Sequence, residues 1–170
     1  MRGCRCPHHA PPPGTRCSLK GKIIKLLATG FGSGLAPLAP GTMGTLVSIP
    51  LYLLLTTSTW PTYFFLLLLL TGTAIYLSQA AEKLYAAKDP PCIVIDEVVG
   101  FLWAMLWVPP TLPGIILGFI FFRLFDILKP FPIRALQDKL PGGYGVVGDD
   151  VMAGIYSCLL LHLLISFSPL

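Results

Sequence analysis

The sequence predicts an all-α, multi-helical integral membrane protein with about four to five apolar helices. Two observations predict this fold class. Hydrophobic residues make up 54% of the 170-residue chain and charged residues only 12%, whereas soluble domains carry about 25% charged residues. The charged residues are also confined to three regions, which separate long apolar segments from one another. This composition is typical of a protein in a lipid environment.

Five apolar segments account for the expected helices. They cover residues 43–55, 63–77, 93–108, 115–128 and 151–167. A helix needs about 20 residues to cross the hydrocarbon core, so several of these segments are short for a span. Residues 1–18 form a Pro-rich tail that we expect to be disordered, and residues 19–170 form the membrane domain.

The positions of the charges predict how these helices are arranged. Six charged residues lie before residue 26, six between residues 82 and 97, and eight between residues 123 and 150. The turns at residues 56–61 and 109–113 carry none. Successive segments should therefore form hairpins with uncharged tips and charged bases. Because Lys and Arg are retained on the cytoplasmic side, we expect the charged loops to face the cytoplasm.

The net charge of +4 is small and is not gathered on one segment, so we expect no nucleic-acid partner. Charged side chains beside apolar helices are costly and usually mark a functional site. The predicted topology brings eight of them to one membrane face. They are the acidic residues Asp96, Glu97, Asp126, Asp149 and Asp150, and the basic residues Arg123, Lys129 and Arg134.

These residue types suit a divalent metal ion and a phosphate group. Mg²⁺ prefers oxygen ligands such as carboxylates, and arginine binds phosphate with two parallel hydrogen bonds. A Gly-rich loop that includes Gly41 can present backbone N–H groups to an anion if Thr42 begins a helix. Taken singly, each group also has a structural explanation: Asp149 could cap the last helix, and Arg123 with Asp126 could form a structural ion pair.

The sequence lacks the motifs that two other classes of phosphatase require for catalysis. No Cys is followed six residues later by Arg, as a thiol-phosphatase loop requires, and there is no Asp-x-Asp pair. The only histidine outside the tail is His162, which lies in the last apolar segment and which we expect to be a packed helix residue or a residue near the far membrane interface. Of the phosphatase mechanisms considered, metal-dependent hydrolysis is the one that the residues of this sequence favour.

Four sequence blocks resemble the phosphatidylglycerophosphatase A family. The first block, within residues 30–44, contains G-F-G-S-G-L-A-P and A-P-G-T-M-G, and the second, residues 95–100, reads I-D-E-V-V-G. The third, residues 122–134, reads F-R-L-F-D-I-L-K-P-F-P-I-R, and the fourth, residues 142–154, reads G-G-Y-G-V-V-G-D-D-V-M-A-G. The resemblance implies Mg²⁺-dependent hydrolysis of phosphatidylglycerophosphate to phosphatidylglycerol and phosphate. It also implies a place in the bacterial inner membrane, where the reaction completes phosphatidylglycerol synthesis.

Our hypothesis gives each residue a role. The five carboxylates bind one or two Mg²⁺ ions, Arg123 and Lys129 hold the phosphate, and Gly41, Thr42 and Arg134 contact the substrate. The ion would polarise the phosphoryl oxygen and activate a water molecule. We favour water over an attacking aspartate because no dedicated nucleophile stands out, although an aspartyl-phosphate stays open.

Two other functions compete with this hypothesis. A phosphatidyltransferase of the same pathway also uses Mg²⁺ and several aspartates, but its D-G-x-x-A-R type of signature is missing from the sequence. A small transporter or channel should carry its carboxylates at mid-membrane, whereas here they gather at segment ends. The sequence does not predict an oligomeric state.

Overall fold

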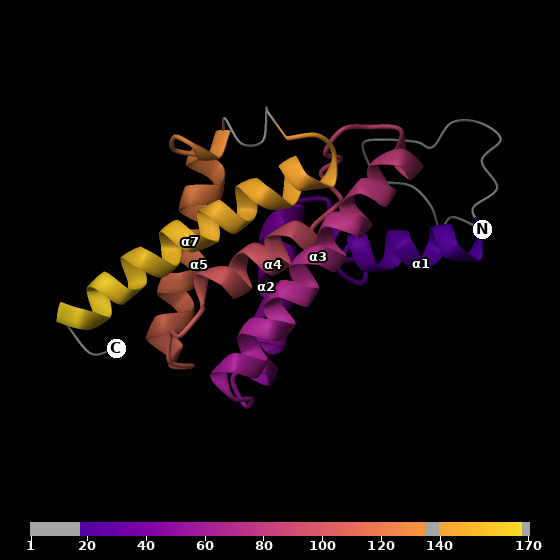
Figure 1. The fold of residues 1–170 in the computed structure, drawn as a ribbon. Coiled ribbons are helices and arrows are strands. Elements are labelled where there is room, and N and C mark those ends of the chain that lie inside the picture. Colours follow the sequence, from indigo (N-terminus) through magenta and orange to yellow (C-terminus); the bar gives the residue numbers. More distant parts are fainter. Residues whose placement is uncertain (1–17, 135–139, 168–170) are drawn as a thin grey trace.

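The computed structural model describes residues 18–134 and 140–167, and within them all regular structure is helical (Figure 1). The helices are α1 (Leu19–Ala28), α2 (Pro40–Leu55), α3 (Trp60–Tyr85), α4 (Ile95–Ala104), α5 (Leu112–Leu128) and α7 (Gly143–Phe167), with a short 3₁₀ turn, η1 (Ser33–Leu35). The predicted all-α class is confirmed. The predicted tail lies outside the described residues except for Ser18, whose hydroxyl caps α1 by accepting a hydrogen bond from the Gly21 N–H.

The short helix α4 lies at the centre of the molecule and packs against α2, α3, α5 and α7. Most of its residues are buried. It approaches α7 so closely that a Cβ added at Gly154 would overlap the carbonyl oxygen of Gly100. Small residues allow this kind of close helix packing. The contact holds the first turn of α4 beside α7, where the acidic side chains lie.

The prediction of four to five membrane helices is not confirmed. Each of the five apolar segments contributes to a helix, but in the described part of the chain two helices, α3 and α7, are long and apolar enough to cross a membrane. The segment at 93–108 differs most, because α4 ends at Ala104. Trp107 then adopts a positive φ of 60°, and Pro109 and Pro110 follow. Proline lacks a backbone N–H and disfavours a helical conformation in the residue before it, so this pair of prolines favours a turn over an extension of α4.

The ends of the helices are sorted by charge. The turn between α2 and α3 and the loop before α5 lie at the lower end of the molecule in Figure 1, and both are uncharged. The C-terminal ends of α3 and α5 and the start of α7 lie at the upper end, together with the charged segments. Neighbouring helices therefore run as hairpins, as the charge pattern predicts.

Buried polar groups at the C-terminal end of α4 all find partners. The Tyr63 hydroxyl donates to the Leu102 carbonyl at 2.9 Å, and the Tyr52 hydroxyl donates to the Val108 carbonyl at 2.7 Å. The Nε2 atom of His162 lies 2.9 Å from the Leu106 carbonyl oxygen. His162 is thus a partly buried residue of α7 that contacts the backbone after α4.

Candidate active site

A cavity of about 310 Å³ opens where the N-terminal ends of α2 and α4 meet the end of α5 and the first turns of α7. Its wall carries six carboxylates and two cationic side chains. They are Asp89, Asp96, Glu97, Asp126, Asp149 and Asp150, with Arg123 and Lys129. If all were ionised, the wall would carry four excess negative charges. Such a wall suits cations, and it would repel an anionic substrate unless cations were bound.

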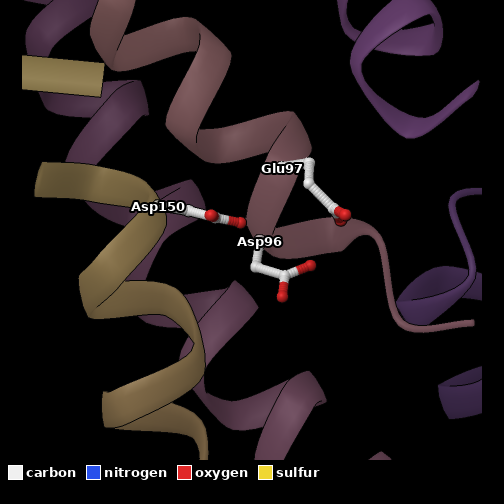
Figure 2. A group of neighbouring side chains, drawn as sticks. All are labelled: Asp96, Glu97 and Asp150. Carbon is white, nitrogen blue, oxygen red and sulfur yellow. The ribbon is translucent and has the colours of Figure 1, made fainter. Parts of the chain in front are cut away.

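Three of the carboxylates form a compact cluster. Asp96 and Glu97 lie in the first turn of α4, and Asp150 extends toward them from α7 (Figure 2). One oxygen atom from each lies within 4.8 Å of the others. Asp96 and Asp150 are 5% and 4% exposed, so water does little to screen their charges.

Two oxygen atoms of this cluster, Asp96 Oδ1 and Glu97 Oε2, are buried without a hydrogen-bond partner among the described residues. A buried polar atom without a partner costs about 1–3 kcal/mol. Three clustered carboxylates, two of them with an unsatisfied oxygen, fit the oxygen ligands that Mg²⁺ prefers. The residues present therefore fit the predicted metal ion.

The cluster changes the proton affinity of its own carboxyl groups. Burial, followed by the charge of Glu97, raises the pKa of Asp96 well above its usual range. Burial and the charge of Asp150 raise the pKa of Glu97 to about 8. Without a cation, the protein therefore holds protons in this cluster near neutral pH. A metal ion would have to displace them.

The two cationic side chains are each held by a neighbouring aspartate. Arg123 Nη1 donates to Asp126 Oδ2 at 2.6 Å, one helical turn away on α5. Lys129 follows α5 with a positive φ of 42°, and its ammonium group donates to Asp149 Oδ2 on α7. Burial alone would lower the pKa of Lys129, but Asp149 raises it, so the ammonium stays charged.

Gly41 brings the start of α2 against this site. A Cβ at this position would overlap Glu97 Oε1 and would lie 3.0 Å from Arg123 Nη1. Only glycine allows the backbone to come so close. The first N–H groups of a helix have no partner within the helix and favour anions. Because α2 begins at Pro40, two residues before Thr42, Gly41 and Thr42 both lie in its first turn.

Eight of the ten predicted site residues line the cavity. The other two, Thr42 and Arg134, are described by the structure but do not line the cavity. Thr42 is half-buried and Arg134 is exposed. Asp149 lies well inside α7 rather than before it, so its alternative role as a helix cap is wrong. The Arg123–Asp126 ion pair does form, within the cavity wall itself.

Asp89 also lines the cavity but was not among the predicted site residues. Its backbone has a positive φ of 48°, and its N–H donates to Glu82 Oε1 at 2.8 Å, which turns the chain after α3 toward the cavity. The only sequence signal was its position before Pro90 and Pro91, typical of a turn.

Comparison with known proteins assigns this arrangement to a family. Residues 26–165 match the family model described as phosphatidylglycerophosphatase A, which covers most of the chain and includes every residue of the acidic cluster. The chain belongs to the phosphatidylglycerophosphatase A family. The resemblance found in the four sequence blocks is thereby confirmed.

Bacterial relatives of this family cover most of the chain. A protein of Escherichia coli (strain K12) named phosphatidylglycerophosphatase A is 39% identical over 147 residues, which span 85% of each chain. A protein of the same name from Haemophilus influenzae is 40% identical, over 81% of this chain and 86% of its own.

A third relative carries another name. This Bacteroides thetaiotaomicron protein, named "Putative phosphatidylinositol-3-phosphatase", is 41% identical over 80% of this chain and 89% of its own. All three names describe phosphatases that act on phospholipids. No solved structure matches the chain.

Proposed function

We propose that this protein hydrolyses the terminal phosphate of phosphatidylglycerophosphate, giving phosphatidylglycerol and phosphate, with Mg²⁺ as cofactor. One observation carries the proposal: three carboxylates from two helices, two cationic side chains and the start of α2 all face one cavity. The family membership and the names of two relatives support the substrate.

Asp96, Glu97 and Asp150 are the residues that would hold Mg²⁺, with Asp126 and Asp149 nearby in the same wall. When bound, the ion would polarise the phosphoryl oxygens and lower the pKa of an attacking water. It would also offset the excess negative charge of the wall, so that an anionic head group could enter.

The protein's own side chains would position the phosphate. Arg123 Nη1 is occupied by Asp126, but Arg123 Nε is buried and has no partner in the described part of the chain, so it remains available to a phosphate oxygen. Lys129 would add a positive charge to stabilise the transferring group. The backbone of Gly41 would approach the phosphate beside Arg123.

Asp149 would serve two partners. Its Oδ2 atom accepts from Lys129, while its buried Oδ1 atom accepts no hydrogen bond from any described residue. We assign Oδ1 the role of accepting a hydrogen bond from the attacking water. An aspartate that attacks phosphorus directly would instead leave a phosphate bound to the protein, which ³²P-labelled substrate would detect.

We further propose that the protein lies in the bacterial inner membrane with this cavity facing the cytoplasm. The two apolar helices α3 and α7 support a membrane association. The charged helix ends gather at the cavity and the uncharged turns lie at the other end, which supports this orientation because basic residues are retained in the cytoplasm.

A phosphate-release assay tests the function directly. Full-length protein in detergent is given phosphatidylglycerophosphate with Mg²⁺ or with EDTA, and the lipid product is identified by mass spectrometry. We expect release that requires Mg²⁺ and that falls sharply in Asp126→Asn and Asp149→Asn. Near-normal Mg²⁺-dependent turnover in both variants would remove these residues from the mechanism, and absence of phosphate release from the wild type would overturn the function.

The Bacteroides relative supports a second substrate, a phosphatidylinositol 3-phosphate. The bond that breaks is again a phosphate monoester on a lipid head group, so the same cavity would serve. Running both lipids in parallel at equal concentration decides between them. Faster turnover of the inositol lipid would assign this chain to that substrate.

A further inference from the structure

The outward face of α1 is apolar, although the helix lies at the charged end of the molecule. Leu19, Ile23 and Leu26 are spaced four and three residues apart, so they share one face. They are 75%, 50% and 50% exposed. In a water-soluble helix this outward face would be polar.

The opposite face of α1 explains how the helix is held. Gly21, Lys25 and Ala28 are buried, and α1 packs against α3 (Figure 1). The Lys25 ammonium lies 4.6 Å above the centre of the Tyr85 ring, a cation–π contact. The helix is therefore fixed to the bundle by one side, and the apolar stripe of Leu19, Ile23 and Leu26 points away from the protein.

Two exposed lysines flank the stripe. Successive residues of a helix are rotated by about 100° around its axis, which places Lys20 on one side of the apolar stripe and Lys22 on the other. Lysine side chains in this position can reach lipid phosphates while the apolar stripe enters the acyl-chain region of the membrane. No Asp or Glu precedes Glu82 in the sequence, so no acidic residue of this region offsets these charges.

Exposed apolar side chains continue along the chain from α1 toward the cavity. Phe31 and Leu38 are 74% and 82% exposed, and Leu35 between them is also exposed. Leu38 is followed directly by Ala39, Pro40 and Gly41, which form part of the cavity wall. A surface that binds residues 19–38 would thus lie next to the cavity entrance.

We propose that residues 19–38 form an in-plane anchor that binds the surface of an anionic lipid leaflet beside the cavity. The anchor lies on the leaflet and does not cross it, because α1 has only 10 residues. Its flanking lysines select anionic lipids by charge. This inference rests on the proposed membrane location but is independent of the proposed chemistry.

Photo-crosslinking in vesicles tests the anchor. Benzoylphenylalanine is placed in full-length protein at Ile23 in the stripe, at Leu69 on the exposed face of α3, or at Lys88 in the exposed loop after α3. After irradiation in phosphatidylcholine vesicles containing phosphatidylserine, mass spectrometry counts lipid adducts. We expect adducts at Ile23 and Leu69, several-fold more than at Lys88.

The outcomes separate the anchor from the membrane location. Adducts at Leu69, with no more at Ile23 than at Lys88, would overturn the anchor alone. Adducts at neither Ile23 nor Leu69 would overturn the membrane location itself. A covalent dimer formed through Ile23 would show that a second copy covers the stripe, which also overturns the proposal.

A charge variant tests the preference for anionic lipid. In Lys20→Gln/Lys22→Gln, we expect the adduct yield at Ile23 to fall several-fold in vesicles with phosphatidylserine and to change little in phosphatidylcholine alone. The matched control is Lys83→Gln/Lys88→Gln, which removes two exposed lysines outside the anchor. An equal yield in the double variant and the control would overturn the selection of anionic lipid.

Discussion

The two ends of α4 treat their buried polar groups in opposite ways. At the C-terminal end, the hydroxyls of Tyr52 and Tyr63 each donate to a backbone carbonyl. At the N-terminal end, Asp96 Oδ1 and Glu97 Oε2 are buried, and no described residue provides them with a partner. Both ends belong to one short helix in the middle of one bundle.

Burial does not explain the difference, since Asp96 at one end and Leu102 and Val108 at the other are all buried. A made hydrogen bond contributes about 1 kcal/mol to stability, whereas an unmade one inside the protein costs about 1–3 kcal/mol. The fold accepts that cost only where the cavity opens. The satisfied end therefore stabilises the bundle, and the unsatisfied end is available to a ligand. Four predictions test this comparison.

The largest effect should come from the acidic cluster. In Asp150→Asn we expect phosphate release to fall about 1,000-fold, because one of three metal-binding carboxylates is lost. The melting temperature without metal should not fall, since a like charge is removed from a crowded group. Turnover is measured at saturating Mg²⁺ and melting in EDTA.

The control for this prediction is Tyr52→Phe, at the satisfied end, which should keep most of its activity. A loss of activity in Tyr52→Phe equal to that in Asp150→Asn would erase the distinction between the ends.

The next largest effect should follow from adding one methyl group. Gly41→Ala forces α2 away from Glu97 and Arg123, and a displacement of about 1 Å at a reacting group costs about 100-fold in rate. The matched control is Gly72→Ala in α3, where a Cβ meets nothing within 4 Å. This control should keep its activity and gain about 0.5–1 kcal/mol in stability. Equal activity in the two variants would mean that the close approach at Gly41 is unnecessary.

Stability without metal should depend on pH through Glu97. Its pKa of about 8 in the folded protein exceeds the usual 4.5. Between these values the folded protein holds a proton that the unfolded chain has released, so stability falls as pH rises from about 4.5 to 8. We expect the melting temperature in EDTA to drop by several degrees between pH 5 and pH 8.

Two further measurements sharpen that pH test. Mg²⁺ should restore stability most strongly at pH 8, where fewer protons compete for the carboxylates. Glu97→Gln should flatten the pH dependence in EDTA. A melting temperature that rises with pH in the wild type would show that the cluster is ionised and favourable without a cation.

Much of the site was predictable because charge is scarce in this chain. Where charged side chains are so few, those beside apolar segments need a reason, and eight of the ten chosen residues line the cavity. The three-residue spacing of Arg123 and Asp126 also predicted their contact. Asp89 was missed because its place depends on how the turn after α3 folds back, which spacing does not encode.

The fold was less predictable than the site. Hydropathy reports that a segment avoids water, but it does not distinguish lipid from protein as the surroundings. Residues 93–108 are as apolar as a membrane span, yet α4 within them is buried by neighbouring helices. The close contact of Gly100 with Gly154 decides this, and it is a tertiary feature.

The smallest effect should come from the satisfied end of α4. Tyr63→Phe removes a hydroxyl that donates to the Leu102 carbonyl, and we expect a loss of about 1 kcal/mol in the free energy of unfolding. Activity at saturating substrate and Mg²⁺ should stay within about twofold of the wild type, since the cavity lies at the other end of the helix. Chemical unfolding in detergent measures the first quantity and phosphate release the second. A variant that keeps its stability but loses its activity would reverse the roles assigned to the two ends, because a purely structural hydrogen bond cannot have that effect.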